Sequence, residues 1–198
     1  MVEDSFAVDS SGFSTSRFVR WFNKKYGRET DNRTWVKCHL MVGTRTKVVT
    51  SVDVSGWTAN DTTYFVPLVE RTAEHFRVRE VAADRAYLSR MNLEAVERVD
   101  GTAYVPFKSN TVPPEGDSVW SRMYHVFMLN RETFLEHYHK RSSAESAFSM
   151  VKAKFGDSLR SKSATGQVNE ALCKILCHNL SVLCHAMHRL AMEPDLCA

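Results

Sequence analysis

The chain has 198 residues, of which 43% are hydrophobic and 25% charged, and its formal net charge is +3. This length suits one domain with a hydrophobic core, and the composition excludes a disordered or fibrous chain. No apolar stretch approaches the roughly eighteen residues of a membrane span, and the first residues lack the pattern of a secretory signal. Five cysteines without framework spacing indicate reduced thiols inside a cell.

The N-terminal third predicts three strands. Residues 6–9 form a short apolar run, which we expect to end in the turn residues 10–12. Two runs rich in β-branched residues, 35–42 and 47–54, are separated by the polar residues 43–46. This arrangement predicts a β-hairpin.

The remaining chain predicts alternating helices and strands. Asp61 is expected to cap a helix whose apolar residues recur at helical spacing. Two further strands are predicted, at 78–84 and 102–107. Further helices are predicted at 88–99, from 120, at about 132–155 with a break near Ser142 left open, and at 168–190. This order predicts an α/β fold, with a mixed five-stranded sheet flanked by helices and extra C-terminal helices.

Basic residues gather in two stretches of the chain. Residues 17–37 hold seven cations and two acidic residues, with aromatic residues between them. Residues 140–162 hold six cations and two acidic residues. Cations mixed with aromatics suit a surface that follows a phosphate backbone and stacks on bases. A solvated charged face with a few core aromatics explains the pattern equally well.

Two aspartates stand at the ends of predicted apolar strands, Asp9 after residues 6–8 and Asp84 after residues 81–83. A carboxylate beside a buried sheet is costly to desolvate unless a cation accompanies it. In open α/β sheets, functional sites collect at such strand ends. The alternative is that each aspartate only ends its strand and caps the turn that follows.

Glu145 also has two interpretations. With Ser142 it forms a capping-box pattern, which would place it at the start of a helix. In a helix that begins by about Tyr138, however, Tyr138, Arg141, Glu145 and Lys152 lie on one stripe roughly 60° wide. Apolar side chains on one flank of this stripe would anchor the helix to the core: Phe148, Val151 and Phe155. A carboxylate aligned with two cations and a phenol suits a helix that binds a metal and grips phosphates.

These residues resemble the DDE transposases of insertion sequences, in the class whose third acidic residue lies in a Y-x2-R-x3-E-x6-K signature. All four signature positions are present, at Tyr138, Arg141, Glu145 and Lys152. The resemblance extends to residues 6–13 around Asp9 and to residues 83–87, where a D-x-x-Y pattern is typical. Asn169-Glu170 and His178-Asn179 also match, so the resemblance covers nearly the whole chain.

The resemblance implies a ribonuclease H-like fold and a metal-dependent mechanism. The whole chain, residues 1–198, would be a single catalytic domain, with a short insertion at 109–131 before the helix that carries Glu145. Asp9, Asp84 and Glu145 would be the catalytic residues and would hold two divalent ions, usually Mg²⁺ or alternatively Mn²⁺. Such oxygen-only ligands suit hard cations better than zinc. Tyr138, Arg141 and Lys152 would bind DNA phosphates near the cut.

The resemblance further implies cleavage at transposon ends and strand transfer into target DNA, by a homodimer in a synaptic complex. Such a mobile-element protein is expected in the cytoplasm, associated with the nucleoid and not with a membrane. Relatives carry a DNA-binding region before the first aspartate, and we expect that region to be absent because only eight residues precede Asp9. The alternatives are a catalytically silent transposase remnant that at most binds DNA non-specifically, and a ribonuclease H-like structure-specific nuclease.

Cysteine and histidine residues in the last predicted helix do not favour a zinc site. Cys173, Cys177 and Cys184 fall on one stripe with leucines, which predicts a face packed in the core. His178 and His185 fall on another face, and a straight helix cannot close a tetrahedral site from both directions. His39 is similarly expected to be a core histidine.

Overall fold

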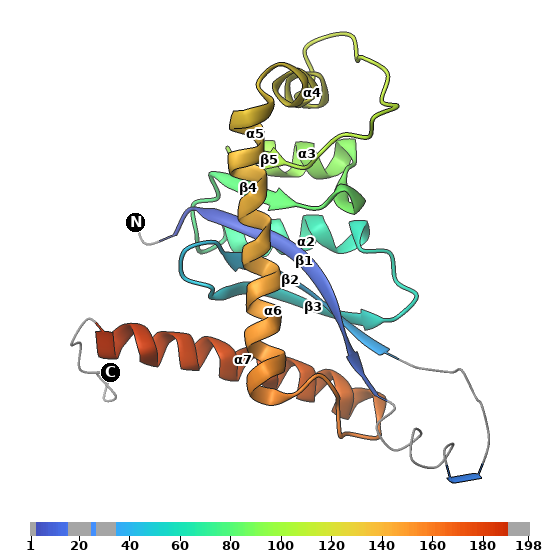
Figure 1. Ribbon diagram of the computed structural model, residues 1–198, viewed down its shortest axis with the longest axis vertical. Coiled ribbons are helices and arrows are strands. Elements are labelled where there is room, and N and C mark those ends of the chain that lie inside the picture. The colour runs from blue at the N-terminus through green and yellow to red at the C-terminus, as the bar shows by residue number, and fades with distance from the viewer. Residues whose placement is uncertain (1–2, 16–24, 27–34, 190–198) are drawn as a thin grey trace.

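The computed structural model describes residues 3–15, 25–26 and 35–189 (Figure 1). Most of the basic stretch 17–37 therefore lies outside the described residues. The strands are β1 (Ser5–Ser14), β2 (Trp35–Gly43), β3 (Val49–Gly56), β4 (Glu80–Ala83) and β5 (Thr102–Tyr104). The helices are α2 (Thr62–Ala73), η1 (Arg85–Tyr87), α3 (Arg90–Glu97), α4 (Val119–Leu129), α5 (Arg131–Tyr138), η2 (His139–Arg141), α6 (Ser142–Phe155) and α7 (Ala164–Arg189).

The five strands form one mixed sheet in the order β3-β2-β1-β4-β5. β1 is antiparallel to β2 and parallel to β4, β2 is antiparallel to β3, and β4 is parallel to β5. The predicted hairpin is the β2–β3 pair. The α/β class and the mixed five-stranded sheet flanked by helices, both expected from the sequence, are confirmed.

β1 is longer than the sequence predicts, and the expected turn at residues 10–12 is wrong. The strand continues to Ser14, because each residue from Phe6 onward has a partner on β2 as far as Trp35. Gly12 allows β1 to pair closely with β2 at this point, because a Cβ on residue 12 would lie only 3.2 Å from the Trp35 ring. Pairing along the sheet outweighs the local turn preference of serine and glycine. Asp9 consequently lies in the middle of a strand.

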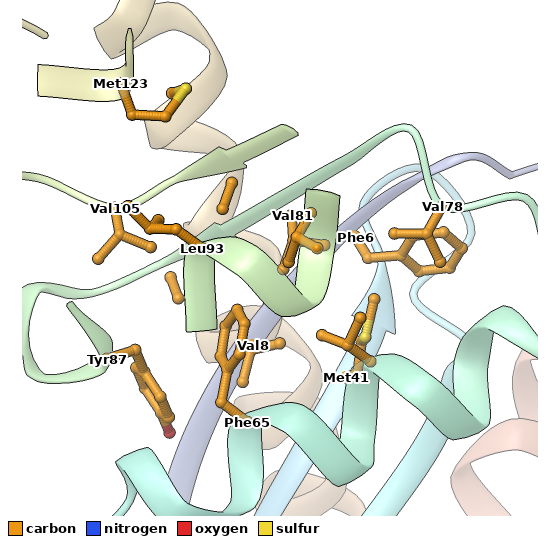
Figure 2. Close-up of a cluster of buried hydrophobic side chains, with 14 of the residues drawn as sticks. Phe6, Val8, Met41, Phe65, Val78, Val81, Tyr87, Leu93, Val105 and Met123 are labelled. Carbon is orange, nitrogen blue, oxygen red and sulfur yellow. The ribbon is translucent and has the colours of Figure 1, made fainter. Parts of the chain in front are cut away.

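Each face of the sheet has its own hydrophobic core. On one face, Phe6 and Val8 of β1 pack with Phe65 of α2 and Leu93 of α3 (Figure 2). On the other face, Ala7 and Phe13 pack with helix α6 and the N-terminal half of α7: the buried residues there include Phe148, Val151 and Ile175. The side chains of β1 alternate between these two cores, as the pleat of a strand requires.

Helices α5 and α6 form one continuous column that passes in front of β1 (Figure 1). The joint at η2 keeps helical dihedral angles, with φ/ψ of −60°/−39° at Tyr138 and −57°/−15° at Ser142. The break near Ser142 is therefore only a local tightening. The N-cap position of α6 is Arg141, which is itself helical and makes no side-chain cap hydrogen bond. The capping-box interpretation of Glu145 is wrong, because Ser142 already lies inside the helical column.

An ion cluster joins the upper end of this column to β4. The Glu80 carboxylate on β4 pairs with both His137 of α5 and Lys140 of η2. Burial alone would raise the pKa of Glu80, but hydrogen bonds from Lys140, Ser5 and His137 hold it below its ordinary value. The strand that leads to Asp84 is thus tied to the helical column that carries Glu145.

Helix α7 holds the lower end of the column through buried polar contacts. The Lys174 ammonium donates hydrogen bonds to the carbonyls of Phe155, Gly156 and Ser158, at 2.9, 3.0 and 2.8 Å, just where α6 ends. The Asn179 amide bonds both the N–H and the C=O of Val49, at the outer edge of β3. These contacts fix where α7 crosses α6 and the sheet.

The predicted core stripe of this last helix is wrong. The side chains of α7 that are buried are Ala171, Lys174, Ile175 and His178. Cys173, Cys177 and Cys184 are exposed, and the leucines between them face outward as well. The polar anchors have taken the inner face, so the apolar stripe faces away from the sheet.

Replacing Lys174 by Met should lower the free energy of unfolding by about 2–3 kcal/mol, because buried carbonyls lose a charged donor while the apolar stem is kept. Urea unfolding followed by circular dichroism measures this. Lys154→Met is the matched control, because Lys154 is exposed and donates a hydrogen bond to the Ser181 hydroxyl and not to backbone carbonyls at the end of α6. The control should change stability by no more than about 0.5 kcal/mol. Equal effects of the two substitutions would contradict the anchoring role of Lys174.

Candidate active site

Asp9 lies on the face of β1 that is covered by the helical column. Ala7 and Phe13 belong to the core on the α6 side, and the alternation of the strand places Asp9 on the same face. The side chain is half-buried, and its Oδ1 accepts a hydrogen bond from the Ser10 N–H at 2.8 Å. A carboxylate in the centre of the sheet therefore points toward α6.

Asp84 is brought beside Asp9 by the parallel pairing of β1 and β4. Val8 pairs with Ala83, and the residue that follows each of them in the chain is an aspartate. Asp84 remains extended, and its Oδ1 accepts a hydrogen bond from the Ala86 N–H at 2.7 Å. The turn-capping role considered for Asp84 is thus confirmed, and it leaves Asp84 next to Asp9.

The charge of Asp9 is destabilised by its surroundings. The pKa of Asp9 is raised to about 6, chiefly by burial. The negative charges of Asp84 and Glu145 also raise it, whereas the hydrogen bond from the Ser10 N–H and the Arg141 cation lower it. Both other carboxylates therefore lie close enough to act on Asp9 electrostatically. The three acidic residues that are far apart in the sequence share one region of the structure.

Glu145 lies on the exposed side of α6 and is paired with a cation of the same helical column. Its Oε1 is 2.7 Å from Nη1 of Arg141, four residues earlier. The Arg141 guanidinium lies 5.6 Å from the centre of the Tyr138 ring. The stripe predicted from the signature is therefore present for Tyr138, Arg141 and Glu145.

Lys152 extends the same stripe toward β1. Its Nζ donates a hydrogen bond to Ser11 Oγ at 2.6 Å and lies 5.5 Å from the centre of the Phe13 ring. Ser11 is two residues beyond Asp9 on the same face of the strand. The Lys152 ammonium therefore lies over β1, in contact with Ser11 and Phe13.

The donor chemistry of this region fits a hard divalent cation. Carboxylate oxygens are the ligands that Mg²⁺ and Mn²⁺ prefer, and a buried carboxylate with a raised pKa gains from a nearby cation. Among the residues that the structure describes, the side chains do not by themselves form a closed cluster of three metal ligands. Glu145 is turned to Arg141, as its ion pair shows.

Sequence reasoning missed the polar group that lies behind the site. The Tyr87 hydroxyl is buried, and its pKa is raised by burial and then by the charges of Asp61, Asp9 and Asp84. Asp61 does not cap α2 as predicted, because its side chain makes no cap hydrogen bond. Its carboxylate instead forms an ion pair with Lys37, and its Oδ1 lies 3.4 Å from Nδ1 of His39. The D-x-x-Y pattern at residues 84–87 could have indicated that Tyr87 lies near the site. No sequence pattern indicated that Asp61 lies near it.

His39 is a core histidine, as expected. It is fully buried, stacks on the Tyr64 ring with centroids 4.0 Å apart, and its Nε2 lies 2.8 Å from Ser55 Oγ. Its register partner on β1 is Ser10, whose side chain points away from α6. His39 therefore packs on the face of the sheet opposite α6 and does not reach Asp9, Asp84 or Glu145.

A family model described as a transposase DDE domain matches residues 2–180. The chain belongs to the DDE transposase family. Among solved structures, the catalytic core domain of BIV integrase is similar over 90% of this chain and 98% of that chain, at 8% sequence identity and a TM-score of 0.34. In the part of this DDE transposase that the structure describes, no helix is both long and apolar enough to cross a bilayer.

Removing the charge of Asp9 should stabilise this transposase domain. The folded state keeps the Asp9 proton up to about pH 6, whereas the unfolded chain loses it near the ordinary aspartate pKa of 3.8. The stability contributed by Asp9 therefore falls as pH rises from about 4 to 6 and is constant above that. Asp9→Asn should raise the free energy of unfolding at pH 7 by about 2–3 kcal/mol, at about 1.4 kcal/mol per pKa unit.

Urea unfolding of both proteins from pH 4 to neutrality, without divalent cations, measures the difference. The difference in the free energy of unfolding between Asp9→Asn and the unmodified protein should increase as the pH rises to about 6 and stay constant above that. Asp157→Asn, on an exposed turn, is the control and should follow the unmodified protein at every pH. A constant gap across the series would mean that Asp9 carries no desolvated charge.

Proposed function

We propose that this DDE transposase domain cuts DNA at transposon ends and joins the free ends to target DNA, with divalent metal ions held by Asp9, Asp84 and Glu145. The observation that carries the proposal is the parallel pairing of Val8 with Ala83, which sets Asp9 beside Asp84 near the helical column that bears Glu145. The charges of both other carboxylates also help to raise the pKa of Asp9. Such a concentration of negative charge has a physical rationale if a cation joins it. Protein cations near the site, chiefly Arg141, compensate it only in part.

Two ions, Mg²⁺ or Mn²⁺, would supply Lewis acidity, activating a water or a 3′-hydroxyl and stabilising the leaving oxygen. The residues of the chain would hold and orient the reacting DNA around them. Asp9 and Asp84 are fixed by the strand pairing and by hydrogen bonds from Ser10 and Ala86. Glu145 is supplied by the helical column, where Arg141 holds its carboxylate.

Three side chains along the stripe would bind DNA phosphates. Arg141 and Lys152 are half-buried cations on either side of Glu145, and Tyr138 packs against the Arg141 guanidinium. A guanidinium offers paired donors to a phosphate, and an ammonium acts as a point charge. Both cations have carboxylate or hydroxyl partners in the structure, which DNA phosphates would replace.

The wider assignments belong to the same proposal. Residues 1–198 would act as one catalytic domain, with 109–131, including α4, as a short insertion. The protein would work on DNA in the cytoplasm at the nucleoid, as a homodimer in a synaptic complex. A silent remnant would bind DNA without cutting it, and a structure-specific nuclease would cut without joining, so an assay for both steps separates the three functions.

Glu145→Gln should lower strand cleavage by more than about a hundredfold while leaving the fold intact, since even indirect changes around metal sites cost 10–100-fold. The amide keeps the shape of the side chain and an oxygen for Arg141, but removes the negative charge that holds a cation. The test is nicking and strand transfer on DNA that carries the inverted repeats flanking the gene, with Mg²⁺. Glu136→Gln, an exposed position on α5, is the matched control and should keep full activity. A Glu145→Gln variant that still nicks at the unmodified rate would refute this mechanism.

DNA binding by the chain alone should be mainly electrostatic and tolerant of sequence. The logarithm of the association constant should fall linearly with that of the salt concentration, because cations on the protein displace ions condensed on DNA. Lys152→Ala should reduce the slope by about 0.9, the amount expected for one lost phosphate contact. Lys154→Ala on the same helix, directed toward Ser181 of α7, should leave the slope unchanged. Binding that is sequence-selective and insensitive to salt would contradict the prediction.

A further inference from the structure

The outward face of α7 is apolar. Leu176, Leu180 and Leu183 expose 58%, 53% and 48% of their surfaces, although helices on the outside of a domain usually present polar side chains there. Cys173 is exposed and Met187 half-buried on the same line. We call these five residues the α7 seam. Contiguous apolar surfaces of this kind mark sites of interaction.

The spacing of the α7 seam indicates what covers it. Residues 173, 176, 180, 183 and 187 are separated by three, four, three and four positions. This is the heptad spacing by which one α-helix packs side chains into the gaps of another over its whole length. A flat ligand or an extended peptide gives no reason for such a repeat. The fitting occupant is therefore a helix about as long as the seam, roughly 20 Å.

The borders of the seam favour an identical helix. The flanking positions hold uncharged residues: Leu172, Cys177, Asn179, Cys184 and Ala186. Charged residues at these positions would select a partner of opposite charge or repel a second copy. Their absence from this stretch of α7 leaves nothing to oppose pairing of the seam with itself. A twofold axis needs such a self-complementary surface, and twofold dimers are the commonest oligomers.

The leucines of the seam are exposed in the part of the chain that the structure describes. Lys174, His178 and Asn179 anchor the inner face of α7 to α6 and to the β2–β3 hairpin. The C-terminal part of the helix extends beyond the edge of the sheet (Figure 1). Beside the seam, a groove of about 290 Å³ lies between Leu176 and the edge strand β3, with space for side chains of a partner helix.

We propose that the α7 seam binds the α7 seam of a second copy of this chain, forming a symmetric dimer. This surface would supply the homodimer required by the proposed function, and in that respect the inference rests on it. Glu145 and Lys152 lie on the flank of α6 opposite Lys154, the side chain that reaches Ser181 of α7, so the active-site flank of α6 would take no part in the contact. Each copy would keep its own carboxylates open to DNA.

Sedimentation equilibrium over a range of protein concentrations tests the dimer. The unmodified chain should change from its mass of 22.6 kDa to twice that value as concentration rises. The double variant Leu180→Glu, Leu183→Glu should remain a monomer, since four carboxylates would face one another in the dimer. Leu129→Glu on α4 is the control, because Leu129 is 78% exposed outside the seam, and this variant should dimerise normally. A monomer at every concentration, or a double variant that dimerises like the unmodified chain, would overturn the proposal.

Thiol reactivity gives a second measurement at the seam itself. Cys177 and Cys184 border the seam, so their alkylation by a maleimide should slow with rising protein concentration in the unmodified chain and not in the double variant. Cys38, which is fully buried in the sheet, is an internal reference. Unchanged alkylation rates in a chain that dimerises would place the contact elsewhere and refute the seam.

Both measurements are independent of DNA cleavage, so they separate this inference from the proposed function. Glu145→Gln should still dimerise even where it no longer cuts DNA. A catalytically active chain that stays monomeric would refute the seam and the homodimer, and would leave the role of the three carboxylates standing. A dimeric chain in which Glu145→Gln cuts normally would refute the proposed mechanism alone.

Discussion

The rest of the structure depends on the parallel pairing of β1 with β4. This pairing places Asp9 beside Asp84 in the sheet, where the pKa of Asp9 is raised to about 6, chiefly by burial. Because water hydrates the ionised Asp9 carboxylate poorly, this charge lowers the stability of the domain unless a cation lies near it. Arg141 is the cation that the helical column provides. A buried carboxylate that costs stability is a common property of sites that bind and act on something else.

The helical column is positioned by contacts at both of its ends. Glu80 on β4 pairs with His137 and Lys140 above the site, and Lys174 of α7 binds the carbonyls where α6 ends. Between these anchors, the column passes over β1 with Glu145 on the same side as Asp9. The helical register, and with it the position of Glu145, is therefore fixed by polar contacts far from the carboxylates.

Helix α7 uses its two faces differently. Its inner face places a lysine, a histidine and an asparagine against backbone groups of α6 and of the hairpin. Its outer face presents the α7 seam, which has no partner among the residues that the structure describes. The polar residues face inward because exposed carbonyls at the end of α6 and the edge of β3 need donors. The apolar residues are left on the outer face, which we propose is covered by a second copy of the chain.

The sequence by itself determined the order of strands and helices, the hairpin, and the signature line of Tyr138, Arg141 and Glu145, because periodicity and turn residues are local properties. It also marked Asp9 and Asp84, although it placed Asp9 at the end of a strand. Only the tertiary structure decided that β1 continues through Ser10–Gly12, since β2 supplies the hydrogen-bond partners that override a turn. It also decided that Asp61 pairs with Lys37 instead of capping α2, and that the cysteine stripe of α7 faces outward. A helical wheel shows that a stripe exists, but which face is buried depends on the backbone groups that neighbouring elements leave unpaired.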